Sequence, residues 1–466
     1  MTAQGKDAIG ARFAGDVNGA MVVQGSIGST GYRNTTAPAD ASKLDADDLL
    51  QGGSALIIEG NVSGGIVLAV PPKNTSTTNP DVDGDGIEDA KEGSARVVTY
   101  GAAPAMVIGA TDHAIAIGPV AGTASGFGLQ IDGSIEGNGV YAGIDGNGLV
   151  IGGRGGAVTV ANGIGVSGLV AASSNGGDAT GLRLGSGAST PELRNSGTIG
   201  AVTTSVAGAE ARALVIDAGA SLPTIRNSGT IKAVAGENGS ATAIVDRSGT
   251  VSLIENSGAI SATGAKADSG RNIAIDLSTN SAGVIVRQTV VGSGFAAPTI
   301  VGDIRLGSGN DTVDLADGVL NGAIAFGGGN NTLTLSGDAG QAGNVTFGAG
   351  NDAMSLAGTS VYIGAVDFGG GIDSLTLSGT SIFPGLAGQF GRAGRGRQRR
   401  HAGRQETHRH RLAGGRQRRR AGGDAGQDRR AGYRLYRRRH RLVRARVQAQ
   451  AAAGGYRYGG GQLYSA

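Results

Sequence analysis

The chain has 466 residues, of which 89 are glycine, and it contains no cysteine and no tryptophan. The lack of cysteine excludes disulfides, thiolate zinc sites and cysteine nucleophiles. Hydrophobic residues make up 39% of the chain but aromatic residues only 4%, a composition that favours short strands and tight turns over helices. The net charge of +3 combines two opposite parts, because residues 391–466 hold 22 Arg, no Lys and three acids, whereas residues 1–390 hold 18 basic and 34 acidic residues.

The N-terminal residues 1–70 are expected to form β-solenoid coils. They begin "MTAQGKDAIGARFAGDVNG", which has no basic region followed by an apolar run, so we expect no secretory signal in this sequence. No stretch of the chain approaches the 18 or more apolar residues of a membrane-spanning helix.

An Asp-rich insertion is predicted over residues 71–95, and its segment 81–92, "DVDGDGIEDAKE", fits the pattern D-x-D-x-D-G-x5-E. Carboxylates at alternate positions around a glycine turn can wrap one Ca²⁺ ion, which needs six to eight oxygen ligands. The flanking "PPKNTSTTNP" does not resemble an EF-hand helix, so the segment resembles the stand-alone calcium loops of thrombospondin-type repeats and bacterial surface proteins. The alternative is a solvated acidic excursion between coils. The predicted ligands of a structural Ca²⁺ are Asp81, Asp83, Asp85, the carbonyl of Ile87, Asp89 and Glu92.

Residues 96–300 contain the strongest internal repeat. Residues 182–202 and 214–234 are identical at 13 of 21 positions at an offset of 32, and a weaker copy follows at 251–263. Each copy has a short strand, an Asn-Ser-Gly corner and a second strand. We predict that Asn and Gly occupy these corners because both tolerate left-handed backbone conformations.

Catalytic residues are scarce in the body, whose single histidine is His113, next to Asp112. No G-x-S-x-G nucleophile motif accompanies it, and a strand-end role is the preferred interpretation of His113. Basic residues are scattered singly, and no cluster of long insertions predicts a substrate groove.

A second repeat occupies residues 301–385, with Gly-rich turns that begin at 307, 327, 348 and 369. Each turn precedes an alternating strand such as 332–335 and follows another short strand. The turns resemble the calcium-binding nonapeptide G-G-x-G-x-D-x-U-x, but they are 20–21 residues apart and the aspartate position holds Asp311, Asn331, Asp352 and Asp373. A structural corner is therefore preferred to a calcium site.

Two or three short strands per 20–32 residues, with corners in register, predict an all-β right-handed parallel β-helix, because stacked coils bury a continuous Val/Ile/Leu/Ala core. A β-sandwich is the competing fold, but the near-identical copies at fixed spacing favour the solenoid.

Residues 386–466 are predicted to be a disordered, Arg-rich tail. Because a basic arm selected for phosphate binding would accept lysine as well, 22 Arg without Lys points to a shifted reading frame: CGN codons arise wherever a codon ending in C precedes one beginning with G. The alternatives are a nucleic-acid or anionic-surface arm and another kind of disordered basic tail.

The Asn-Ser-Gly corners, the Gly/Asn/Thr/Ser-rich coils and the missing cysteines resemble the passenger regions of bacterial autotransporters, which a C-terminal outer-membrane barrel delivers to the cell surface. Neither the signal nor the barrel of that family is evident, so the chain resembles a passenger fragment truncated at both ends. The resemblance implies a non-enzymatic stalk or adhesion surface, cell-surface or extracellular in the intact parent, with an unknown host or abiotic surface as partner. A polysaccharide-acting β-helix enzyme and nucleic-acid binding through the tail are the alternatives, and no specific nucleic acid is expected.

Overall fold

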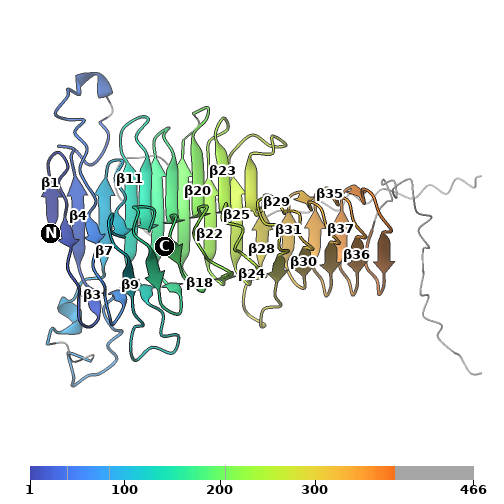
Figure 1. Cartoon of the computed structure of the whole chain (residues 1–466), viewed down its shortest axis with the longest axis horizontal. Helices are drawn as coiled ribbons and strands as arrows, with labels where there is room; N and C mark the ends of the chain where they lie inside the picture. The colour runs from blue at the N-terminus through green and yellow to red at the C-terminus, as the bar shows by residue number, and fades with distance from the viewer. Residues whose placement is uncertain (39, 83, 85, 205, 384–466) are drawn as a thin grey trace, which may run out of the picture. The chain divides into compact units, whose positions relative to one another are not determined.

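The computed structural model describes residues 1–38, 40–82, 84, 86–204 and 206–383, and the predicted tail lies outside this range. The described residues form a parallel β-helix, which confirms the predicted all-β solenoid (Figure 1). Three sheets of 12 parallel strands run the length of the stack, and each coil contributes one strand to each sheet. No helix in the described part of the chain is long and apolar enough to cross a membrane.

The first sheet contains, in spatial order, β1 (Thr2–Gln4), β4 (Ser26–Thr30), β7 (Arg96–Tyr100), β11 (Ser134–Gly139), β15 (Leu169–Ser174), β19 (Thr198–Thr203), β22 (Thr230–Val234), β25 (Ala259–Thr263), β28 (Thr299–Val301), β31 (Val319–Asn321), β34 (Gly340–Ala342) and β37 (Val361–Ile363). The second sheet contains β2 (Ala11–Phe13), β5 (Leu56–Ile58), β8 (Met106–Ile108), β12 (Gly146–Ile151), β16 (Ala179–Leu184), β20 (Glu210–Ile216), β23 (Ser240–Asp246), β26 (Asn272–Asp276), β29 (Asp303–Arg305), β32 (Ile324–Ala325), β35 (Val345–Thr346) and β38 (Val366–Asp367).

The third sheet contains β3 (Met21–Val23), β6 (Ile66–Leu68), β10 (Leu129–Ile131), β14 (Ile164–Val166), β18 (Glu192–Asn195), β21 (Thr224–Asn227), β24 (Leu253–Asn256), β27 (Ile285–Gln288), β30 (Thr312–Leu315), β33 (Thr332–Leu335), β36 (Ala353–Leu356) and β39 (Ser374–Leu377). A small sheet of β9 (Ile115–Ile117), β13 (Val158–Val160) and β17 (Ala188–Ser189) widens three coils.

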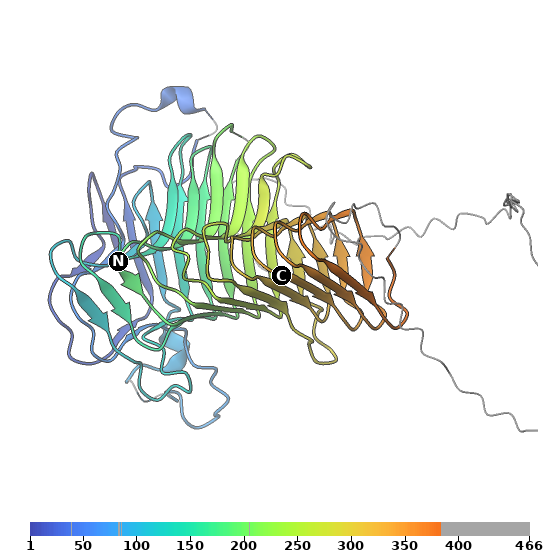
Figure 2. The ribbon, with the colours of Figure 1, turned by 45° about the vertical axis from the view of Figure 1, so that its right-hand side comes forward.

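Two insertions leave the second coil, as Figure 2 shows in dark and light blue. The first joins β4 to β5 and contains the 3₁₀ turn η1 (Ala41–Lys43). The second joins β6 to β7, contains η2 (Asp89–Lys91) and includes the Asp-rich segment.

The coils become smaller along the chain. The pairing of Thr198 with Thr230 spans 32 residues, whereas that of Thr299 with Val319 spans 20. The difference lies in the first two strands and the corner between them: β19, residues 204–209 and β20 together hold 19 residues, whereas β28, Gly302 and β29 hold seven. Between the second and third sheets, the short coils stack Phe326, Phe347 and Phe368, whose successive ring centroids are 4.7 and 5.2 Å apart.

In-register pairing places like residues above one another in the core, where they are removed from water. One fully buried column of the first sheet consists of Val170, Ile199, Ile231, Ile260, Ile300 and Leu320. A second core between the first and second sheets of the wide coils is made of alanine alone: Ala172, Ala179, Ala201, Ala211, Ala233, Ala235, Ala241 and Ala262. Alanine at these positions lets the two sheets approach more closely than larger side chains would allow.

The Asn-Ser-Gly corners join the third sheet to the first and contain a ladder of buried amides. Asn195 Nδ2 donates to Asn227 Oδ1 at 2.7 Å, and Asn227 Nδ2 donates to Asn256 Oδ1 at 2.8 Å. Gln288 continues the ladder in the next coil. The ladder begins at Asn195 because its partner in the preceding coil is Val166, which has no side-chain donor, and Asn195 Oδ1 has no hydrogen-bond partner among the described residues. Each amide is both donor and acceptor, so a column of identical residues satisfies itself.

The predicted reason for these corner residues is wrong. None of the three asparagines or the glycines Gly197, Gly229 and Gly258 has a positive φ. The glycines are needed for space, since a Cβ would lie 2.1–2.2 Å from a carbonyl oxygen of the preceding coil. Close stacking of coils, rather than a left-handed turn, therefore selects Gly here.

We expect Asn227→Ala to lower the free energy of unfolding by about 2 kcal/mol, because it removes the middle of the ladder and weakens the pairing of two buried amides. Urea denaturation followed by circular dichroism measures the change. The control is Ser228→Ala, at an exposed neighbour in the same corner. Equal losses in the two variants would contradict a role for the ladder.

Candidate functional site

The Asp-rich segment is tied to itself and to the first coil. Asp81 accepts the backbone N–H of Gly84 at 2.7 Å and that of Gly86 at 3.0 Å. The buried Asp89 accepts the N–H of Val82, at 3.1 Å to Oδ1, and Glu92 Oε1 accepts from Gln24 Nε2 at 2.8 Å.

The structure says less about the other predicted calcium ligands. Asp83 and Asp85 fall outside the described residues, and Ile87 is exposed. No group of three or more metal-binding side chains occurs among the residues that the structure describes.

The aspartates of the short coils form a second polar ladder. Asp311 Oδ1 accepts the N–H of Val284 at 2.8 Å, and Asn331, Asp352 and Asp373 each repeat the contact one coil further on, at 2.8–3.0 Å. Each side-chain oxygen therefore accepts a backbone N–H group of the preceding coil, which links the two coils. This arrangement is a structural corner, since the carboxylates point along the stack one after another rather than toward a shared ion.

The ladder buries two carboxyl groups, and one oxygen of each group has no hydrogen-bond partner among the described residues. Asp311 and Asp352 are each 1% exposed, and the Oδ2 atom of each has no hydrogen-bond partner in the described part of the chain. Burial raises the pKa of Asp311 and of Asp352, and the charge of Asp373 adds to the rise at Asp352. Asn331 occupies the equivalent position without this cost, because its Nδ2 donates to the Gly329 carbonyl at 3.2 Å.

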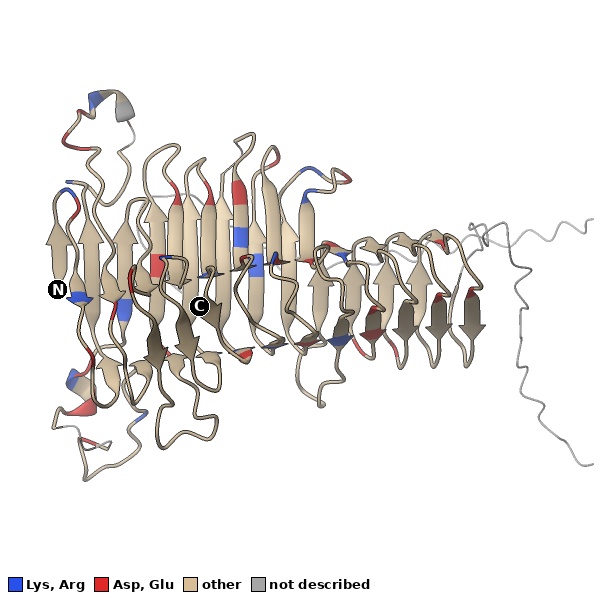
Figure 3. Cartoon of the chain, viewed as in Figure 1, with Lys and Arg blue, Asp and Glu red and all other residues tan. Residues whose placement is uncertain are grey.

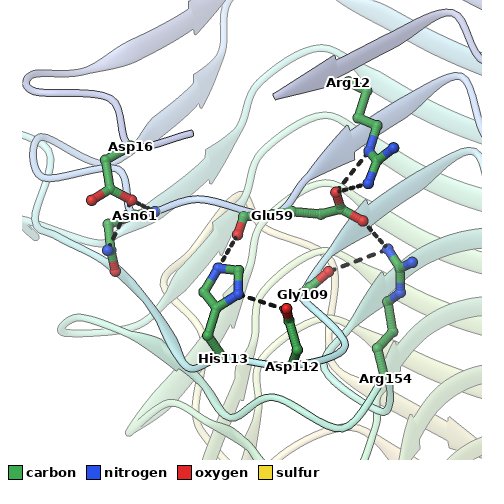
Figure 4. A network of polar contacts seen from close by, with 8 residues as sticks. All are labelled: Arg12, Asp16, Glu59, Asn61, Gly109, Asp112, His113 and Arg154. Carbon is green, nitrogen blue, oxygen red and sulfur yellow. Dashed lines mark hydrogen bonds and ion pairs between the residues drawn. The ribbon is translucent and has the colours of Figure 1, made fainter. Parts of the chain in front are cut away.

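His113 lies in the turn before β9, within a polar network that crosses several coils (Figure 4). Its Nδ1 is 2.7 Å from Asp112 Oδ1, and its Nε2 is 2.9 Å from the backbone oxygen of Glu59. The Asp112 hydrogen bond, followed by that to the Glu59 carbonyl, raises the pKa of His113. Because both ring nitrogens face acceptors, the imidazolium form is favoured and neither nitrogen is placed to accept a substrate proton.

Glu59 is the centre of that network and is 7% exposed. Its Oε2 lies 2.7 Å from Arg12 Nη2 in the first coil, and its Oε1 lies 3.0 Å from Arg154 Nη1 two coils beyond. The buried carboxylate is thus compensated by two guanidinium groups, and it ties together coils that are far apart in sequence.

Charged residues recur along the strands of the stack (Figure 3), and on the second and third sheets they form ion pairs between coils. On the third sheet one column reads Arg194, Arg226, Glu255, Arg287 and Asp314. Glu255 pairs with both Arg226 and Arg287, and Arg287 also pairs with Asp314 at 3.4 Å. Cross-strand pairs of this kind stabilise a sheet and keep its outer surface polar.

The outer face of the second sheet is hollowed in two places. A pocket of about 380 Å³ has an apolar floor that includes Ile57, Val107 and Val150 and is bordered by Arg154 and Arg183. A second pocket, of about 430 Å³, lies further along the sheet, over β20, β23, β26 and β29. Its arginines are Arg212, Arg247, Arg271 and Arg305, and its carboxylates are Glu210, Asp246 and Asp276.

These pockets were not predicted from the sequence, in which their basic residues are scattered singly. The structure corrects this view, because residues about 30 apart lie side by side once the coils stack: Arg183 is paired with Val215, Val215 with Val245, and Asp276 with Arg305. Coil length was only a partial signal for these residues, since the offset between paired positions changes from 32 at Arg183 and Val215 to 29 at Asp276 and Arg305.

The comparisons with known proteins identify no relative. No protein-family model, curated protein or solved structure matches this chain. The fold and the surfaces described above therefore carry the functional argument alone.

We expect Asp311→Asn to raise the free energy of unfolding at pH 7 by about 1–3 kcal/mol, because an amide there can use both polar atoms as Asn331 does. The pKa of Asp311 is raised in the folded state, so the wild-type stability from this group is present below the unfolded pKa and is lost as the pH rises through the folded pKa. The variant should lack this loss in urea denaturation at pH 4 to 8.

Asp338→Asn is the control, since Asp338 is an exposed aspartate of the short coils that lies outside the ladder. Its change should stay within about 0.5 kcal/mol. A destabilised Asp311→Asn protein would show that the buried carboxylate is needed in its charged form.

Proposed function

We propose that this chain is a non-enzymatic β-solenoid of the autotransporter passenger type, which acts at a cell surface or outside the cell as a stalk or adhesion surface. The observation that carries the proposal is the stacking of 12 coils through three continuous parallel sheets. Eleven intervals of about 4.8 Å give a stack about 53 Å long. Such a stack projects a rigid body and repeats its outer surface from coil to coil.

The polar ladders support a mechanical role. The amide ladder, the aspartate ladder and the charged column of the third sheet all connect one coil to the next, so each coil is held by side chains as well as by its backbone. Pulling on the stack loads many cross-coil contacts together, as a stalk requires.

Polysaccharide cleavage is the second candidate, and the larger pocket of the second sheet favours it, because carboxylates and arginines lie there together. The buried Asp246 already accepts the backbone N–H groups of Ser248, Gly249 and Val251. Asp276 accepts the backbone N–H and the hydroxyl of Ser278. Carboxylates engaged in turns are less available as acids or bases, so we favour binding over cleavage. Nucleic-acid binding through the tail concerns residues outside those described.

A direct test pulls single molecules of the full chain in a force spectrometer. A coil-by-coil stalk should unfold in steps of about 70 Å for 20-residue coils and about 110 Å for 32-residue coils, at about 3.5 Å per residue. In parallel, the protein on beads should be retained under flow on glycan or abiotic surfaces. Release of new reducing ends from acidic or neutral glycans, abolished by Asp276→Asn, would establish the enzyme instead.

We also propose that Ca²⁺ orders the Asp-rich segment, with Asp81, Asp83, Asp85, Ile87, Asp89 and Glu92 as oxygen donors. Support comes from the loop sequence and from the way Asp81 already gathers backbone N–H groups around one turn. Calcium would stabilise the folded loop rather than take part in chemistry.

Calcium titration of the full chain by calorimetry should show one site, and saturation at 100 times Kd should add about 2.7 kcal/mol to the stability of the loop. Protease cleavage within 71–95 should slow accordingly. Asp81→Asn should abolish both effects, whereas Asp112→Asn, an exposed aspartate outside the segment, should preserve them. A calcium-independent cleavage rate would rule the ion out.

A further inference from the structure

Two arginines of the body differ from all the others. Among residues 1–383 the chain has 12 arginines, and ten of them form ion pairs with carboxylates in the described structure: Arg12, Arg33, Arg96, Arg154, Arg183, Arg194, Arg212, Arg226, Arg247 and Arg287. Arg271 and Arg305 have no carboxylate partner among the described residues, and both line the larger pocket of the second sheet.

Backbone carbonyls hold these two side chains in place. Arg271 Nη1 donates to the oxygens of Asn238 and Gly239 at 2.5 and 2.8 Å, and its Nη2 donates to that of Glu237 at 2.9 Å. Arg305 Nη2 donates to the oxygen of Gly270, the residue before Arg271, at 2.6 Å. Neutral carbonyls orient the guanidinium groups but leave their charge uncompensated, and each retains N–H donors for a ligand.

The rest of the pocket restricts the kind of anion that fits. Arg212 and Arg247 are already neutralised, by Asp178 at 3.1 Å and by Asp217 at 3.3 Å. The carboxylates of the pocket can accept hydrogen bonds from hydroxyl groups, which a sugar chain carries on every unit. Acid groups that alternate with hydroxyl groups are therefore complementary to this surface, and that is the chemistry of an acidic glycan.

We propose that Arg271 and Arg305 bind the carboxylates of an acidic polysaccharide that lies along the second sheet. Guanidinium groups bind carboxylates with two parallel hydrogen bonds, which favours them for this task. A chain running along the stack meets a new coil about every 4.8 Å and passes from the larger pocket toward the smaller one, bordered by Arg183. The inference rests on the proposed adhesion surface, to which it assigns a ligand class.

The test must separate this pocket from the tail, whose 22 arginines attract any polyanion. The full chain has no cysteine, so Ser278→Cys places a single fluorophore at the exposed edge of the pocket, and Ser228→Cys places one at a third-sheet corner. Polygalacturonate at physiological ionic strength should change the fluorescence at position 278 but not at position 228. Its fully methyl-esterified, uncharged form should change neither.

In the Ser278→Cys background, Arg271→Gln with Arg305→Gln should weaken polygalacturonate binding at least tenfold. Arg194→Gln, which removes one positive charge from the third sheet, should change it less than twofold, and melting curves should confirm that each variant is folded. Equal losses in the double variant and in Arg194→Gln, or no loss in either, would overturn the proposal.

A further arm uses an oligo(dT) strand as the probe. If the double variant loses oligo(dT) binding as strongly as polygalacturonate binding, the pocket recognises charge alone and the glycan assignment is wrong. The adhesion proposal can fail independently, since retention on surfaces under flow does not require this pocket. Loss of retention with intact polygalacturonate binding would reject the stalk function and leave the glycan site standing.

Discussion

In-register hydrogen bonding between successive coils is the constraint on which the rest of this molecule depends. Each residue lies about 4.8 Å from its partner in the next coil, so every position must tolerate a similar neighbour on both sides. Aliphatic columns meet this condition by dispersion and burial, and amide columns meet it because Asn195 and Asn227 are both donor and acceptor. A column of identical charges cannot meet this condition, because each side chain would repel its neighbours in the coils on both sides.

Charges are tolerated where the column alternates or where a neighbouring column compensates. Along the third sheet, Glu255 lies between Arg226 and Arg287 and pairs with both. In the aspartate ladder, Asn331 lies between Asp311 and Asp352 and so separates two buried carboxyl groups by two coils. Most arginines of the stack are compensated by a neighbouring carboxylate. A cation without such compensation is therefore a candidate site for a partner outside the chain.

The repeats allowed the fold to be predicted well, but the sites less so. The 32-residue offset between residues 182–202 and 214–234 predicts stacked coils, and the structure pairs Asn195 with Asn227 at that offset. The role of the corner residues was misjudged, because a glycine required by φ and one required by space look alike in sequence. The pocket arginines were missed since Arg271 and Arg305 lie in coils of different length, so no single period aligns them.

The sequence by itself determined the class of fold, the coil period and the buried columns, because a residue that recurs once per coil must stack on its own copy. It also marked residues 81–92 as a carboxylate-rich loop. Only the tertiary structure decided which charges are compensated. Ion pairing depends on side chains from adjacent coils meeting within a few ångströms, and insertions of differing length shift those meetings. The contrast between Arg247, which pairs with Asp217, and Arg305, which among the described residues donates to a backbone carbonyl, arises from that packing.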